Sequence, residues 1–128
     1  MKLLLDTHLL LWAALALDAL PPKAQALMSD PDNRLLFSPV SIWEVAIKTS
    51  LKRPEFSADP RLLRRALLDN DYEELSITGE HATAVADLPL IHRDPFDRFL
   101  IAQALAAGVM LVTADDVVAR YPGPIMRV

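Results

Sequence analysis

Short, fully apolar runs alternate along this chain with stretches of helical periodicity, and this alternation restricts the fold more than any other feature. The runs at residues 3–5, 35–37 and 109–112 lack the polar positions of a strand that has one face in water. Strands that are apolar on both sides need cover on both faces, which a parallel sheet between two layers of helices provides. The pattern therefore predicts an α/β domain with a parallel sheet.

Caps, prolines and glycines set the expected boundaries of these elements. Asp59-Pro60 and Asp94-Pro95 each predict a helix N-terminus, and Gly108 predicts a helix C-terminus. We expect strands at residues 3–5, 35–37, 74–77, 109–112 and 125–128. We expect helices at residues 7–17, 22–29, 41–50, 60–70, 78–88 and 95–107, a loop at 54–59, and a short helix that ends near residue 120.

Length and composition indicate a single domain and limit its chemistry. The chain has 128 residues, so residues 1–128 form one domain that can bury its own core. It contains no cysteine, which excludes disulfides and thiolate metal sites. Its three histidines have no zinc-binding spacing. We therefore expect any metal to be held mainly by oxygen, which points to magnesium or manganese.

Charge and hydropathy narrow the class of partner. The net charge of −4 argues against a simple nucleic-acid binder, but a nuclease can take its positive charge from bound cations. A mean hydropathy of +0.24 predicts an interface with another protein. The apolar run at 9–17 is too short to span a membrane, and Asp6 and His8 interrupt a signal-peptide-like start. We expect a cytoplasmic protein with no membrane role.

Four acids lie where a parallel sheet places its ligands, beyond the carboxyl ends of the strands. Asp6 directly follows the first strand, and Asp115 follows the strand at 109–112. Glu44 and Asp97 lie in the first turns of their predicted helices. Each acid could equally be a structural cap, with Glu44 closing a capping box on Ser41. Spacing alone leaves both interpretations open.

Four motifs follow one another from the first strand to the last. They read LLDTHLLLW at residues 4–12, SIWEVAIK at 41–48, HRDPFDRFLIAQA at 92–104 and LVTAD at 111–115. In this order and spacing they resemble the motifs of PIN-domain proteins, and most closely those of the VapC toxins of bacterial toxin–antitoxin pairs. The resemblance extends over the whole chain and includes its length.

The resemblance implies a fold, an activity and partners. The fold is a three-layer α/β/α domain with a central parallel sheet of five strands. The activity is a Mg²⁺- or Mn²⁺-dependent endoribonuclease that cleaves RNA phosphodiester bonds, and the partners are a second copy of the chain and a cognate antitoxin. The catalytic acids carried over are Asp6, Glu44, Asp97 and Asp115.

The four acids receive different expected roles. Asp6, Asp97 and Asp115 are the expected metal ligands, with Asp6 and Asp97 as the main ones. Asp115 and Glu44 either bind a second ion or orient metal-bound water. Thr113 and Asp94 are candidates for supporting these ligands. Without metal the carboxylates repel one another, so at least one should titrate at unusually high pH, coupled to its neighbours.

Other polar and aromatic residues are expected to be structural. His8 and His92 flank motif acids but are interpreted as structural histidines. Lys48 is assigned to a solvated face, as are the arginines of the helix at 60–70. Trp12 and Trp43 are expected in the core or an interface.

Rival functions come from different classes. A phospho-receiver domain would need a lysine after the strand at 109–112, where the chain reads Thr113-Ala114-Asp115. A phosphatase of the haloacid dehalogenase type would need a second acid at His8. A PIN-like module that binds RNA or protein without catalysis, and a PIN ribonuclease without a toxin role, remain alternatives.

Overall fold

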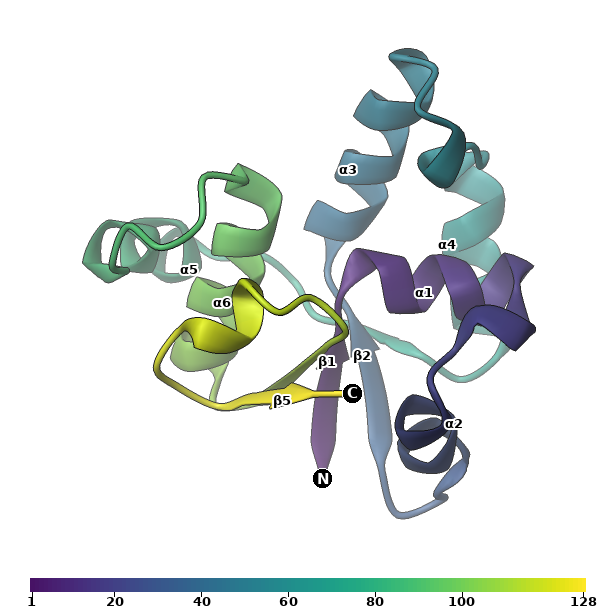
Figure 1. The fold of residues 1–128 in the computed structure, drawn as a ribbon, viewed down its shortest axis with the longest axis horizontal. Helices are drawn as coiled ribbons and strands as arrows, with labels where there is room; N and C mark the ends of the chain where they lie inside the picture. The colour runs from purple at the N-terminus through teal and green to yellow at the C-terminus, as the bar shows by residue number, and fades with distance from the viewer.

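The computed structural model describes residues 1–128 and confirms the α/β class, with a five-stranded, entirely parallel sheet in the order β3-β2-β1-β4-β5 (Figure 1). The strands are β1 (Lys2–Leu5), β2 (Arg34–Phe37), β3 (Glu73–Glu74), β4 (Met110–Thr113) and β5 (Ile125–Arg127). The helices are α1 (Thr7–Leu15), α2 (Pro22–Ser29), α3 (Pro39–Ser50), α4 (Pro60–Asp69), α5 (Gly79–Ala84) and α6 (Pro95–Ala107).

The central strands bury both of their faces, as their apolar runs predict. Leu3 and Leu5 of β1 belong to one core cluster, together with buried side chains of α1 and α4. Leu4, between them, belongs to a second cluster formed mainly with α6. Successive side chains of a strand point to opposite faces of the sheet. All three leucines are fully buried, which shows that both faces are covered. The two clusters are the two sides of one sheet.

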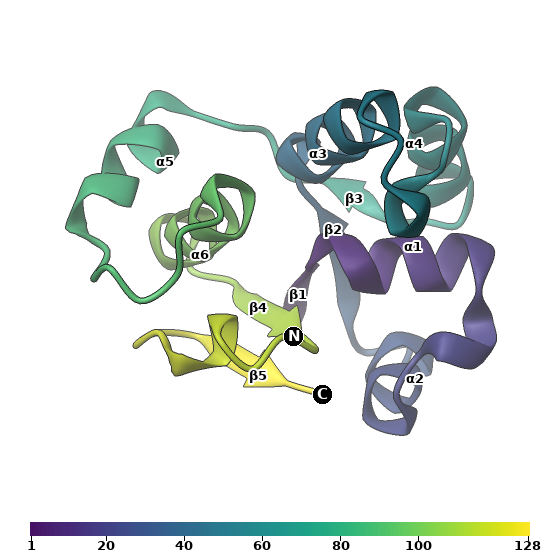
Figure 2. The ribbon, with the colours of Figure 1, turned by 45° about the horizontal axis from the view of Figure 1, so that its top comes forward.

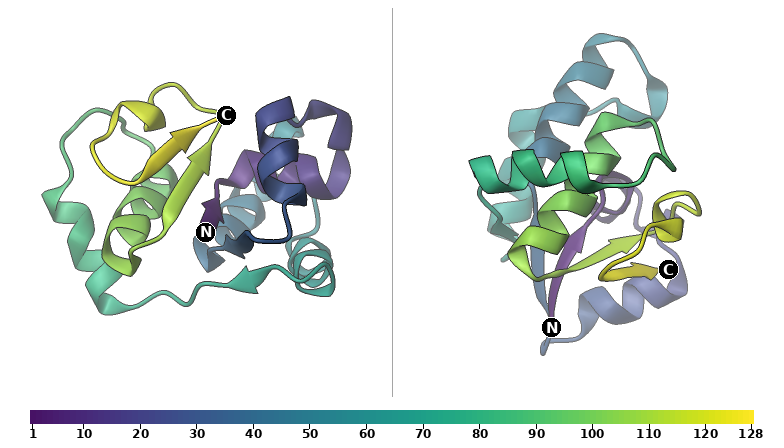
Figure 3. Two further views of the ribbon diagram at one scale, coloured as in Figure 1. Left: turned by 90° about the horizontal axis from the view of Figure 1, so that it is seen from below. Right: turned by 90° about the vertical axis from the view of Figure 1, so that its left-hand side faces the viewer.

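The helices form two layers around the sheet. In Figure 2, α5 and α6 lie on one side of the strands, and α1, α2 and α4 on the other. The right-hand view of Figure 3 shows α5 and α6 in front of the strands and α2 behind them. Helix α3 rises from the end of β2 and joins the layers, since its Val40 belongs to one core cluster and its Val45 to the other.

The strand order reverses between β1 and β4. The chain builds the sheet outward from β1 through β2 to β3, and then returns to the other side of β1 with β4 and β5. The amide of Asp6 donates to the carbonyl of Val112 at 3.0 Å, which continues this central pairing past the end of β1. Residues that follow β1 and β4 are thereby brought together at one edge of the sheet, where ligands of such folds bind.

Three expected boundaries were wrong for local reasons. Helix α3 begins at Pro39 rather than at Ser41, because Ser38 caps it through the amide of Val40 and proline suits the first position. Helix α1 ends at Leu15, and a 3₁₀ turn at Leu17–Ala19 takes the place of its expected last turn. The helix expected at 78–88 is divided into α5 and a 3₁₀ turn at Val85–Asp87.

The third strand was also misplaced. We expected it at residues 74–77, whereas β3 covers only Glu73–Glu74, which pair with Leu36 and Phe37. A 3₁₀ turn at Pro54–Phe56 lies in the expected loop, and another at Val118–Arg120 is the expected short helix. Gly108 ends α6 with a left-handed φ of 69°, as predicted. No helix has both the length and the apolar character needed to cross a membrane.

Helix α1 offers a direct test of which apolar side chains hold the fold. Leu10 is fully buried between α1 and the sheet, whereas Leu15 on the same helix is 65% exposed. Leu10→Ala should lower the free energy of unfolding by about 2–5 kcal/mol, because it leaves a cavity. Leu15→Ala, the matched control, should change it by less than about 0.5 kcal/mol. Urea unfolding measures both, and similar losses in the two variants would contradict this packing.

Candidate metal centre

Asp6 lies at the end of the central strand and is almost completely buried. As the N-cap of α1 it accepts a hydrogen bond at Oδ1 from the amide of Leu9, at 3.0 Å. Its Oδ2 accepts one from the Thr113 hydroxyl at 2.6 Å. Burial raises the pKa of the Asp6 carboxyl above its usual range, and the bonds from Thr113 and Leu9 only partly oppose this. Asp6 is thus both a structural cap and a member of the site.

Asp97, Asp94 and His92 form a tight group at the start of α6. Each offers one ligand atom, and these atoms lie within 4.8 Å of one another. His92 Nε2 is 2.8 Å from Asp97 Oδ2. Asp94 caps α6 through the amides of Phe96 and Asp97, as predicted. The carboxylate of Asp97, however, points to His92 rather than back to the cap.

Asp97 titrates abnormally. Its pKa is raised to about 7, first by burial and then by the negative charge of Asp94, with smaller contributions from Glu44 and Asp6. The hydrogen bond with His92 lowers it only in part. The expectation that one acid of the cluster titrates high is therefore confirmed for Asp97. Four carboxylates are close enough here to oppose one another's ionisation.

Glu44 is held by side chains, not by a helix cap. Because α3 begins at Pro39, Glu44 lies in the helix interior, and the capping-box interpretation was wrong. Its Oε1 accepts a hydrogen bond from the Thr7 hydroxyl at 2.6 Å, and its Oε2 accepts one from Lys48 Nζ at 2.6 Å. The Ser41 hydroxyl lies 2.9 Å from the Thr7 hydroxyl and donates to it, since the single Thr7 proton goes to Glu44. Both oxygens of this buried carboxylate thus have a partner from the chain.

Lys48 does not lie on a solvated face, so that prediction was wrong. Only 16% of its side chain is exposed, and its ammonium lies 3.5 Å from Asp94 Oδ2 as well as 2.6 Å from Glu44. Burial alone would lower the pKa of Lys48, but Glu44 and Asp94 outweigh it and raise this pKa above its usual value. The i, i+4 spacing of Glu44 and Lys48 is a signal in the sequence that could have identified this pair, but the sequence analysis did not use it.

Asp115 joins the site through Thr113. The Thr113 hydroxyl donates to Asp6 and accepts from the Asp115 amide at 3.0 Å. Asp115 Oδ1 accepts from the amides of Val117 and Val118, which fixes the turn after β4. Thr113 therefore supports a candidate ligand, as proposed from the sequence. Asp115 adopts the capping geometry that was its alternative interpretation.

The donor set fits a divalent cation of the magnesium or manganese type. Carboxylate oxygens dominate it, with one imidazole nitrogen from His92, and no thiolate is available. Burial raises the pKa of Asp97 most, and the negative charge of Asp94 adds to this shift. Sequence reasoning had selected Asp6, Asp97 and Asp115 as ligands and had interpreted His92 as structural. The tightest group contains Asp97 with Asp94 and His92 instead.

The fold is a parallel α/β domain with a group of carboxylates at the switch point of its sheet, and a comparison with protein families shows which family it belongs to. The chain belongs to the PIN domain family, whose model matches residues 3–124. A comparison with curated protein sequences gives no significant match.

Solved structures with this fold include components of toxin–antitoxin complexes. VapBC2 from Rickettsia felis, bound to a promoter DNA fragment, aligns with a TM-score of 0.74 at 14% identity, covering 99% of this chain and 98% of that one. VapBC-5 from Mycobacterium tuberculosis aligns with a TM-score of 0.62 at 23% identity, and it also covers 99% of this chain and 98% of that one. FitAcB from Neisseria gonorrhoeae aligns with a TM-score of 0.55 at 17% identity, covering 91% of this chain and 89% of that one. At these identities the likeness establishes the three-layer fold.

The pKa of Asp97 predicts how stability depends on pH in metal-free buffer. Because folding raises this pKa from 3.8 to about 7, the carboxyl stabilises the fold fully below pH 3.8, and this contribution is lost as the pH rises through about 7. The chain in EDTA should therefore unfold at lower urea concentration at pH 8 than at pH 5. Asp97→Asn should flatten this dependence.

The matched control is Asp32→Asn, at an exposed acid of the turn before β2. It should keep the pH dependence of the unmodified chain. If the stability of Asp97→Asn depended on pH as strongly as that of the unmodified chain, the raised pKa of Asp97 would be contradicted.

Proposed function

We propose that this chain is a Mg²⁺- or Mn²⁺-dependent endoribonuclease that acts as the toxin of a toxin–antitoxin pair. The catalytic part is carried by one observation, the ligand atoms of His92, Asp94 and Asp97 that lie within 4.8 Å of one another at the switch point of the sheet, where burial and neighbouring acids raise the pKa of Asp97 to about 7. Such crowding costs stability unless a cation is bound, and shifted acids gather at functional sites. Membership of the PIN domain family and the motif resemblance supply the reaction.

The acids have distinct tasks in this proposal. Asp97, Asp94 and His92 hold the cation together with Asp6, and Asp115 borders the site beyond Thr113. When bound, a divalent cation lowers the pKa of water and neutralises charge on phosphate oxygens. Thr113 fixes the orientation of Asp6 by its hydrogen bond. Glu44, held by Thr7 and Lys48, presents a fixed negative charge at the same edge.

Removal of metal or of one acid tests the catalytic proposal. Purified protein should cleave single-stranded RNA with Mg²⁺ or Mn²⁺ and lose cleavage in EDTA, since the nucleophile depends on the cation. Asp97→Asn should reduce the rate at least about 10³-fold, while Asp32→Asn should leave it unchanged. Cleavage is measured on a labelled RNA, with a DNA of the same sequence for comparison.

Cleavage that persists in chelator would exclude the metal-dependent mechanism. RNA binding without cleavage by the unmodified chain, at any concentration of Mg²⁺ or Mn²⁺, would favour the non-catalytic PIN-like module instead.

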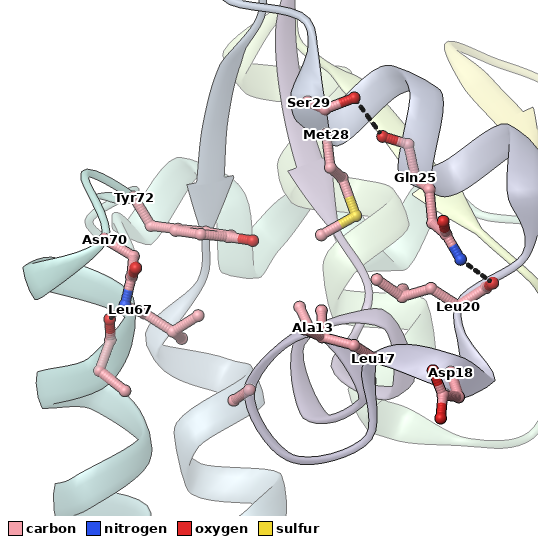
Figure 4. Close-up of a pocket in the computed structure, with 12 residues that line it drawn as sticks. Ala13, Leu17, Asp18, Leu20, Gln25, Met28, Ser29, Leu67, Asn70 and Tyr72 are labelled. Carbon is pink, nitrogen blue, oxygen red and sulfur yellow. Dashed lines mark hydrogen bonds between the residues drawn. The ribbon is translucent and has the colours of Figure 1, made fainter.

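The toxin part of the proposal rests on an apolar groove at the C-terminal end of α1. The groove has a volume of about 560 Å³ and lies between α1, α2 and α4. In Figure 4, Met28, Leu67 and Tyr72 point into it, and Gln25 at its rim bonds to the carbonyl of Leu20 at 3.0 Å. An amphipathic helix of an antitoxin could bury its apolar face in such a groove.

The groove and the acids lie at opposite ends of α1. The nine residues of this helix separate them by about 13 Å along its axis, so an antitoxin seated in the groove needs an extension to reach the metal centre. Structures of this fold solved as toxin–antitoxin complexes support such a partner. We also propose a homodimer, since Trp43 of α3, Leu51 at the C-cap of α3 and Leu62 of α4 are 59–69% exposed.

The partner proposal predicts two assemblies. The chain alone should sediment as a dimer at micromolar concentration, and it should co-purify with the protein encoded immediately upstream. Ala14→Glu places a charge in the groove and should weaken this capture at least about tenfold. Ala82→Glu, at an exposed position of α5, is the control and should capture the upstream-encoded protein as well as the unmodified chain does. A monomer that leaves the upstream protein unbound would contradict the toxin role.

A further inference from the structure

Lys48 is a cation that the chain itself places in the metal centre. Its ammonium is 2.6 Å from Glu44 Oε2 and 3.5 Å from Asp94 Oδ2. Asp94 also belongs to the group with His92 and Asp97 that offers three ligand atoms to a metal. One lysine therefore joins the carboxylate of α3 to the ligand group of α6.

Aromatic rings hold this ammonium in place. Its nitrogen lies 4.3 Å from the centre of the Phe56 ring and 5.5 Å from that of Phe96, distances at which a cation is attracted to a ring face. Phe96 is itself packed edge-on against Trp43, with ring centres 5.0 Å apart. A lysine on a solvated surface is free to reorient, whereas this side chain has one enclosed position.

Glu44 has no oxygen that a divalent ion could take without competition. Thr7 donates to Oε1, and Lys48 donates to Oε2. A divalent ion on Oε2 would lie within a few ångströms of the ammonium, and their repulsion in a half-buried site is large. Glu44 is therefore a ligand of the lysine and not of a metal, although it belongs to the acidic motifs.

We propose that Lys48 occupies the place of a second divalent cation, so that the centre takes one metal ion, bound on the side of His92, Asp94 and Asp97. Two-metal nucleases use their second ion as a positive charge against the scissile phosphate. Here the ammonium supplies that charge, because it lies 2.6 Å from Glu44 and 3.5 Å from Asp94, a member of the ligand group with His92 and Asp97. The inference rests on the proposed metal-dependent cleavage of RNA.

The number of bound Mn²⁺ ions tests this proposal without any need for cleavage. Titration of the metal-free chain with Mn²⁺, followed by electron paramagnetic resonance of the free ion, should give one ion per chain. Lys48→Met keeps the aliphatic stem between the two phenylalanines but removes the charge, which frees Glu44 and Asp94 for a second ion. This variant should bind two ions, and Lys48→Arg should bind one.

Lys23→Met is the matched control, since Lys23 is an exposed lysine of α2. It should bind one ion, like the unmodified chain. With only one Mn²⁺ ion bound per chain, Lys48→Met should lower kcat on RNA about 10²-fold and Lys48→Arg should restore most of it, as expected for loss of a positive charge at the phosphate.

The possible outcomes separate this inference from the proposed function. Two ions in the unmodified chain, or one ion in both the unmodified chain and Lys48→Met, would overturn the role of Lys48 and leave metal-dependent cleavage standing. No Mn²⁺ binding by the unmodified chain would overturn the metal-dependent function and this inference together.

Discussion

The hydrogen bond between Asp6 and Thr113 is the interaction on which the candidate metal centre depends. It joins the residues that follow β1 and β4, the two strands between which the sheet order reverses. Asp6 is also the N-cap of α1, so one side chain fixes the start of that helix and the edge of the sheet. Its position places a carboxyl group deep in the protein, where burial raises its pKa, and its charge adds to the raised pKa of Asp97.

Much of the fold could be predicted because its central elements depend on local chemistry. Leu3–Leu5 and the capped start of α6 at Asp94-Pro95 are specified by residues next to one another in the chain. Strand β3 was harder, because its two glutamates form a strand only through pairing with Leu36 and Phe37. Residues whose conformation is set by a distant partner leave little pattern in the sequence.

The acids of the site could be predicted from the sequence, but the side chains that bond to them could not. Asp6 and Asp115 could be found because strand ends are visible in the sequence. The bond from Thr7 to Glu44 links residues 37 positions apart, and no periodicity indicates it. Lys48 was interpreted as solvated, and its contact with Asp94 arises only when α3 and α6 meet. His92 was interpreted as structural, although its partner Asp97 is only five residues away. Side chains that connect elements are the part of a site that sequence reasoning misses.

The contact between Trp43 and Phe96 has an optical consequence. The chain has only two tryptophans, and Trp43, which is 59% exposed, touches the ring that precedes Asp97 in α6. Trp12, the other indole, packs on His8 along α1 with ring centres 5.8 Å apart. Replacement of Trp12 by phenylalanine leaves one tryptophan, beside the first turn of α6. Its emission should then report changes around this turn in real time, with no label attached to the protein.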